Sequence, residues 1–199
     1  ISLAYFQNIL SSLIQSGGCA ISLDDFKEIQ KNNSKLPKRS FCITFDDGFK
    51  NNLEYAAPVL VKYNIPTMFY ITSSFIDQNK MSWVDRIEWA FDVTKKKYID
   101  LPWRKGSYFN NSDDIIKLLE EIRENVKDGQ NFDQDEFANL IQSLLAVPLV
   151  DQLDGELDEK LNWGDVKLLC SEKLFKVGGH THNHKILSKL KPDELAFEI

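Results

Sequence analysis

The chain has 199 residues, of which 43% are hydrophobic and 27% charged. This composition is typical of a globular protein and excludes a disordered chain; the length fits one domain, or one domain with an insertion. Because 24 Lys and Arg residues stand against 30 Asp and Glu residues, the formal net charge is −6, which disfavours nucleic acid as a partner. No apolar stretch approaches ~20 residues, so no membrane-spanning segment is predicted.

The N-terminus and the cysteines indicate little about function. The chain begins with Ile1 and shows no basic region followed by an apolar run, so no signal peptide is visible. The compartment stays open between cytoplasm and cell envelope, and the missing leader favours the cytoplasm. Cys19, Cys42 and Cys170 are odd in number and far apart, which excludes a disulfide framework and predicts buried free thiols.

Hydrophobic spacing and capping residues predict an alternation of helices and strands. Pro58 falls inside one expected helix and marks a kink or a restart there. Helices are expected at 3–15, 22–29, 51–63, 82–93, 112–126, 133–146, 163–170 and 191–199. Strands are expected at 19–21, 40–45, 66–71, 98–101 and 174–177.

The order of these elements predicts an α/β fold. Residues 40–71 read as strand, helix, strand over about 30 residues, which is a βαβ unit and therefore predicts parallel strands. Helical patterns dominate from about 75 to 162, so this stretch is interpreted as a helical insertion between sheet elements. The whole of 1–199 is then a single domain that carries one insertion.

Histidine is the most informative residue type. The only three histidines, His180, His182 and His184, fall within five residues, directly after a predicted strand and two glycines. Asp46 and Asp47 likewise follow a predicted buried strand. Because the carboxyl ends of parallel strands meet at one edge of a sheet, we expect carboxylates and imidazoles to converge there.

Such a group of side chains suits a borderline divalent metal, with Zn²⁺ first and Co²⁺ or Ni²⁺ as alternatives. Two histidines and one carboxylate leave positions open for water and substrate, which is typical of a catalytic site. Adjacent aspartates on an extended segment point to different sides, so one can bind the ion while the other accepts a proton. A plain turn is the alternative for Asp-Asp-Gly alone, and a fortuitous surface run is the alternative for the histidines.

At this point the motifs match a known family. Thr44–Gly48, Thr-Phe-Asp-Asp-Gly, resembles the first motif of the polysaccharide deacetylases, the NodB-homology enzymes of carbohydrate esterase family 4. Gly179–His184 resembles their second motif, His-Ser/Thr-x-x-His. The flanking segments 6–26, 66–71 and 186–199 are also similar, and 82–91 resembles members with a long insertion that are associated with surface-glycan synthesis. No resemblance is seen at about 95–160.

The resemblance implies a partial or distorted (β/α) barrel of parallel strands and a role for each motif residue. Asp46 becomes the catalytic general base, and Asp47, His180 and His184 become the metal ligands. His182 falls on a variable position, where we expect a supporting or surface role, although a ligand role for it is conceivable. Thr181 is expected to support the loop by hydrogen bonds.

The predicted function is a metal-dependent hydrolase that removes acetyl groups from N-acetylated sugars of a polysaccharide or surface glycan. The alternative is a non-catalytic metal- or carbohydrate-binding remnant of the same fold. A Mg²⁺ phosphotransferase is weaker, because acid-box phosphatases place their aspartates two apart. The family's third motif and its general-acid histidine have no counterpart here, so we expect a deacetylase domain incomplete at both ends, weak or no activity, and self-association through open sheet edges.

Overall fold

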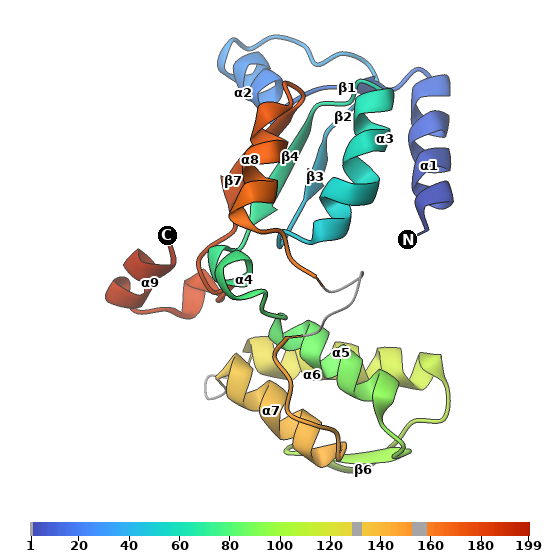
Figure 1. Cartoon of the computed structure of the whole chain (residues 1–199), viewed down its shortest axis with the longest axis vertical. Coiled ribbons are helices and arrows are strands. Elements are labelled where there is room, and N and C mark those ends of the chain that lie inside the picture. The colour runs from blue at the N-terminus through green and yellow to red at the C-terminus, as the bar shows by residue number, and fades with distance from the viewer. Residues whose placement is uncertain (1, 129–132, 153–158) are drawn as a thin grey trace. The chain divides into compact units, whose positions relative to one another are not determined.

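The computed structural model describes residues 2–128, 133–152 and 159–199. The chain divides into two compact units (Figure 1). The sheet unit contains Ile1–Lys80 and Asp154–Ile199, and the insert unit contains Met81–Leu153. Each unit has its own cluster of buried apolar side chains. The insert unit lies within the insertion expected at about 75–162, and whether 1–199 acts as one catalytic domain stays a prediction.

A three-stranded parallel sheet organises the sheet unit. Its strands are β3 (Ile43–Phe45), β4 (Thr67–Ile71) and β7 (Phe175–Gly179), in the order β3-β4-β7. Phe45 is in register with Phe69 of β4, and Ile71 at the end of β4 is in register with Gly179. The carboxyl ends of β3 and β7 therefore flank the end of β4, as the predicted βαβ unit requires.

Two of the strand predictions need correction. The run 40–45 forms two strands, because β2 (Ser40–Phe41) pairs in parallel with β1 (Cys19–Ala20), whereas β3 joins the main sheet. The glycines 178 and 179 do not end β7 but belong to it. A side chain at Gly178 would place its Cβ 3.1 Å from the ring of Tyr70, so the close neighbouring strand favours glycine there.

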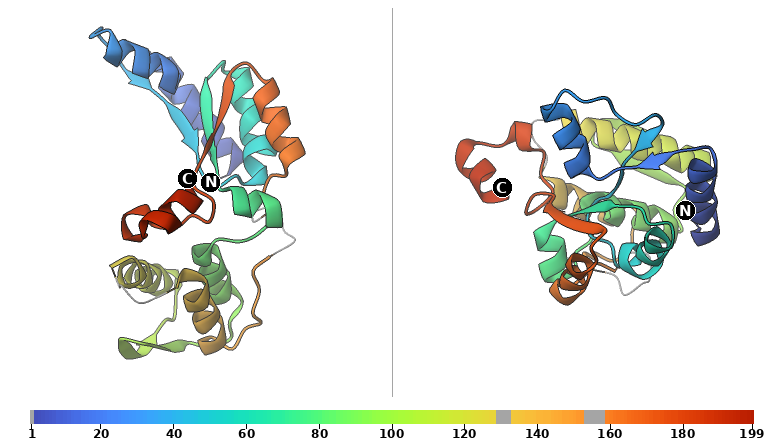
Figure 2. Two further views of the ribbon diagram at one scale, coloured as in Figure 1. Left: turned by 90° about the vertical axis from the view of Figure 1, so that its left-hand side faces the viewer. Right: turned by 90° about the horizontal axis from the view of Figure 1, so that it is seen from above.

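The helices of the sheet unit follow the predicted ranges closely, except that the helix Ser73–Gln78 was not expected. Pro58 lies in the first turn of α3, directly after a π-helical turn, so the expected restart is confirmed. Helices α3 and α8 lie over one face of the sheet (Figures 1 and 2). The helical elements are α1 (Leu3–Gln15), α2 (Leu23–Lys31), the π-helix Asn52–Ala56, α3 (Ala57–Lys62), α4 (Ser73–Gln78), α8 (Trp163–Ser171), a 3₁₀ turn (Leu187–Lys189) and α9 (Pro192–Glu198).

Aromatic rings hold the sheet in register. The ring of Phe69, in the central strand, stacks on Phe45 at a centroid distance of 5.2 Å and meets Phe175 edge-on at 5.2 Å. Leu60 of α3 is completely buried beneath the sheet. One aromatic side chain from each strand therefore contributes to the same core, which fixes the relative positions of the strand ends.

The insert unit combines helices with one hairpin. Its elements are α5 (Trp83–Val93), β5 (Tyr98–Leu101), β6 (Arg104–Tyr108), α6 (Ser112–Asp128) and α7 (Gln134–Leu144). The strand expected at 98–101 is confirmed, and it pairs antiparallel with β6. The sequence did not indicate β6, because only Ser107 of its five residues is buried and no apolar alternation is present.

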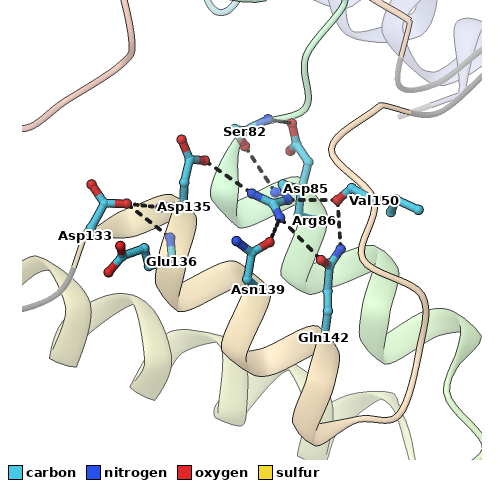
Figure 3. A network of polar contacts seen from close by, with 9 residues as sticks. All are labelled: Ser82, Asp85, Arg86, Asp133, Asp135, Glu136, Asn139, Gln142 and Val150. Carbon is cyan, nitrogen blue, oxygen red and sulfur yellow. Dashed lines mark hydrogen bonds and ion pairs between the residues drawn. The ribbon is translucent and has the colours of Figure 1, made fainter.

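A buried arginine joins the segments of the insert unit (Figure 3). The Arg86 side chain is 4% exposed, and its Nε donates to the carbonyl of Val150 at 2.9 Å. Its guanidinium also donates to the side chains of Asp135 and Gln142, each at 3.3 Å, and to Asn139. Gln142 Nε2 donates to the same Val150 carbonyl at 3.0 Å. The network ties α5, α7 and the segment after α7 together.

The fold is thus mixed α/β with parallel strands, as predicted. The strands of the described residues do not close into a barrel, so the barrel stays a prediction. The thiols of Cys42 and Cys170 are exposed and Cys19 is half-buried, so the expectation of buried cysteines is wrong. Cys42 faces outward between two inward-facing neighbours of the extended chain. None of the helices in the described ranges is long and apolar enough to cross a bilayer.

Candidate metal and active site

The end of β3 turns sharply at the aspartate pair. Asp46 is exposed, whereas Asp47 is half-buried and adopts a left-handed backbone conformation with φ of +69°. Gly48 follows with φ of +77°, and a Cβ there would lie 2.8 Å from Cδ1 of Ile76. The Gly48 carbonyl accepts a hydrogen bond from the Leu161 backbone N–H at 2.8 Å. These contacts hold the turn that presents Asp47.

The end of β7 presents the histidines. The backbone N–H of His180 donates to the carbonyl of Ile71 at 2.7 Å, which extends the β4–β7 ladder by one residue. The Thr72 hydroxyl donates to the His180 carbonyl at 3.2 Å. Thr181 and His184 then adopt left-handed conformations, with φ of +66° and +57°, so the chain turns back instead of continuing as a strand.

Three of the predicted residues converge across the end of β4. Asp47 Oδ1 lies 3.7 Å from His180 Nε2 and 3.5 Å from His184 Nε2. One ligand atom of each residue lies within 4.8 Å of the ligand atoms of the other two. Asp46 and His182 do not belong to this group, which is called the Asp-His-His cluster below.

The cluster fits a metal ion by geometry and by its donors. Two ligands that each lie ~2.0–2.2 Å from a tetrahedral Zn²⁺ are roughly 3.3–3.6 Å apart, close to the separations of Asp47 from both histidines. Among the described residues, the buried Asp47 Oδ1 and His184 Nδ1 have no hydrogen-bond partner. A buried carboxylate oxygen without a donor is costly, and a cation between these three side chains would satisfy it.

Aromatic rings line the cluster. Tyr70 lies 6.3 Å from the His180 ring, and Phe75 lies 6.1 Å from the His184 ring, measured between centroids. The buried Lys160 places its Nζ 5.4 Å from the centroid of Phe75. Each imidazole therefore has an aromatic neighbour, and 34% of the His180 side chain and 36% of the His184 side chain are exposed.

His182 turns away from the cluster. Its Nδ1 lies 2.8 Å from the Ser73 hydroxyl, and its ring meets Phe197 edge-on at 5.0 Å. Its backbone carbonyl accepts a hydrogen bond from Ser74 at 2.9 Å. Thr181 supports the loop through its carbonyl, which accepts from the Ser73 backbone at 3.3 Å. Both residues therefore fasten the loop to the start of α4.

Sequence reasoning missed Glu198, which gave no signal because its partner is 15 residues away. Glu198 is 3% exposed at the end of α9. Its carboxylate accepts two hydrogen bonds from Asn183, at 2.7 Å from the backbone and 2.9 Å from the side-chain amide. Burial alone would raise the pKa of Glu198, but these hydrogen bonds and the nearby charge of Lys185 outweigh it and hold the pKa below its usual range.

Comparisons with known proteins identify the family of this chain. The family model for polysaccharide deacetylase matches residues 33–134, just over half of the chain, and the chain belongs to that family. The match includes the Thr44–Gly48 motif and also residues 95–134, where no resemblance was expected, whereas residues 135–160 lie outside it. It ends before His180.

Two solved structures share the fold. A de-N-acetylase from Aggregatibacter actinomycetemcomitans aligns with a TM-score of 0.52 and 15% identity over 92% of this chain and 45% of its own length. The Streptococcus pyogenes deacetylase PplD, solved in complex with acetate, aligns with a TM-score of 0.54 and 13% identity over 100% of this chain and 53% of its own. This chain therefore spans about half the length of these proteins. No curated protein matches the sequence.

Proposed function

We propose that this chain carries the metal-binding half of a deacetylase that removes acetyl groups from N-acetylated sugars of a polysaccharide or surface glycan. The observation that carries the proposal is the Asp-His-His cluster, which lies beside the exposed Asp46 at the ends of parallel strands. Membership of the polysaccharide deacetylase family supports the reaction class.

Asp47, His180 and His184 would hold a divalent ion, with Zn²⁺ favoured and Co²⁺ or Ni²⁺ as alternatives, because two imidazoles and one carboxylate suit borderline metals. When bound, the ion supplies positive charge that polarises the acetyl carbonyl and lowers the pKa of water. Three protein ligands are fewer than the four of a tetrahedral Zn²⁺, so one position would remain for water or substrate.

Asp46 is proposed as the general base. It directly follows β3, is exposed, and precedes the ligand Asp47 by one residue, so it lies next to the cluster without belonging to it. Its carboxylate would accept the proton of the attacking water. The amine then leaves only if it is protonated, and all three histidines of the chain are accounted for by the cluster and by the Ser73 contact of His182. We therefore expect weak turnover from this chain alone.

Metal analysis separates the two aspartates and the three histidines. After dialysis against Zn²⁺, the wild type is expected to hold about one ion per chain, and Asp47→Asn, His180→Ala and His184→Ala are expected to lose it. Asp46→Asn and His182→Ala are the matched controls and are expected to retain it. Unchanged metal content in both His180→Ala and His184→Ala would sink the assignment.

The general base is tested by acetate release from an N-acetylated chito-oligosaccharide in a chain extended to the length of its structural neighbours. Asp46→Asn is expected to lower the rate by ~10²–10⁴-fold while retaining metal. The alternative function, metal or carbohydrate binding without turnover, predicts metal binding but no acetate release from that extended chain. The cytoplasmic location and self-association expected from the sequence stay predictions.

A further inference from the structure

The last turn of α9 is hydrogen-bonded to the loop 181–184, which connects His180 to His184 of the cluster. The Glu198 carboxylate accepts both donors of Asn183, and the Glu198 backbone carbonyl accepts the His182 N–H at 2.9 Å. The buried Glu198 therefore accepts three hydrogen bonds, one from His182 and two from Asn183.

The start of α4 is hydrogen-bonded to the backbone carbonyls of the same loop. The backbone N–H groups of Ser73 and Ser74 donate to the carbonyls of Thr181 and His182, at 3.3 and 2.9 Å. In this loop the carbonyls of Thr181 and His182 thus accept hydrogen bonds from α4, and the N–H groups of His182 and Asn183 donate to Glu198.

The backbone of this loop needs such support. Thr181 and His184 both adopt left-handed conformations, which cost a non-glycine residue roughly 1–2 kcal/mol each. A strained conformation persists only when surrounding contacts hold it in place. If the loop relaxed toward ordinary backbone angles, the direction of the His184 imidazole would change and its Nε2 would leave Asp47.

We propose that Glu198 is a positioning residue for the metal site: by holding Asn183 and His182, it keeps His180 and His184 directed at Asp47. This inference rests on the proposed metal-binding function. Both carboxylate oxygens act as acceptors here, so glutamine, which has one acceptor oxygen, makes both contacts only if the Asn183 amide turns over. Glutamine also lacks the negative charge that strengthens both of these hydrogen bonds.

The dissociation constant for Zn²⁺, measured by competition with a chelating dye, tests the proposal. Glu198→Gln is expected to weaken binding about 10–100-fold, the usual effect of losing a group that orients a metal ligand. The matched control is Glu194→Gln on the same helix, where the carboxylate accepts from the Lys191 backbone and touches no residue of the loop. It is expected to bind Zn²⁺ like the wild type. Circular dichroism checks that both variants are folded.

Asn183→Ala keeps the test decisive if Glu198→Gln does not fold, since it removes only the side-chain donor and is expected to weaken Zn²⁺ binding to a smaller extent. If Glu198 acts through Asn183, the effects of the two substitutions are not additive in the double variant. A second readout needs no metal: hydrogen exchange of the Asn183 backbone amide, which donates to the Glu198 carboxylate, is expected to accelerate in Glu198→Gln and to be unchanged in Glu194→Gln.

The outcomes separate the two proposals. If the wild type binds Zn²⁺ and Glu198→Gln and Asn183→Ala bind it equally well, the positioning role is overturned and the proposed function stands. If the wild type binds no metal, the proposed function fails, and unchanged amide exchange in Glu198→Gln would overturn the positioning role as well.

Discussion

Replacing Arg86 by methionine is expected to destabilise the insert unit by about 2–6 kcal/mol. Methionine keeps an apolar stem of similar length, so the substitution removes the guanidinium donors without leaving a large cavity. The acceptors that lose a donor are the side chains of Asp135, Asn139 and Gln142 and the carbonyl of Val150.

The burial of each acceptor sets the magnitude. Gln142 is fully buried, so its orphaned Oε1 costs about 1–3 kcal/mol. Val150 retains the hydrogen bond from Gln142, and the exposed Asn139 can turn to water, so each loses only a net contribution of about 0.5–1.5 kcal/mol. Asp135 is 49% exposed and is hydrated after the loss, so it adds little to this total.

Urea unfolding followed by tryptophan fluorescence measures this effect. In a Trp163→Phe background the remaining tryptophans, at positions 83, 89 and 103, all lie in the insert unit, so the signal reports its unfolding. Arg123→Met is the matched control, because Arg123 pairs with Glu88 at 36% and 43% side-chain exposure and is expected to cost about 0–1 kcal/mol. A cost for Arg86→Met no larger than that of Arg123→Met would refute the reasoning.

Two further predictions concern the Gly48 turn and the pH dependence of stability. Gly48→Ala is expected to destabilise the sheet unit by more than the ~1–2 kcal/mol of a left-handed alanine, because its Cβ would also meet Ile76 at 2.8 Å. Gly106→Ala is the control for the backbone cost alone, since Gly106 has a φ of +64° and the nearest contact of its Cβ would be at 4.0 Å. Equal losses of unfolding free energy in urea for the two variants would contradict the packing argument. Burial raises the pKa of Glu88 above its ordinary value of 4.5 despite the nearby Arg123. The folded state therefore binds this proton more tightly than the unfolded state, and the free energy of unfolding falls as the pH rises from about 4.5 through the raised folded pKa. Glu88→Gln removes this loss, so the stability of the variant relative to the wild type is expected to rise between pH 4 and pH 7, and a fall would contradict the sign.

The helix starts and the parallel sheet could be predicted because local chemistry determines them. Ser22, Ser82 and Asn162 each cap a helix, and each forms a reciprocal capping box with the aspartate three residues later. A side chain that satisfies a backbone N–H within four residues needs no tertiary contact, so the sequence alone is sufficient. The short apolar strand, helix and strand of 40–71 determined the parallel pairing in the same way.

The sequence alone was also sufficient to predict that the aspartates and histidines lie at one edge of the sheet, because the carboxyl ends of parallel strands meet at the same edge. Only the tertiary structure decided which of these side chains meet. On a continued extended strand, His180, His182 and His184 would all point to the same side. The left-handed turns at Thr181 and His184 break that alternation, and they direct His182 to Ser73 and the other two histidines to Asp47. The bonds from Glu198 and α4 that accompany these turns join residues far apart in the chain, and no local pattern encodes such contacts.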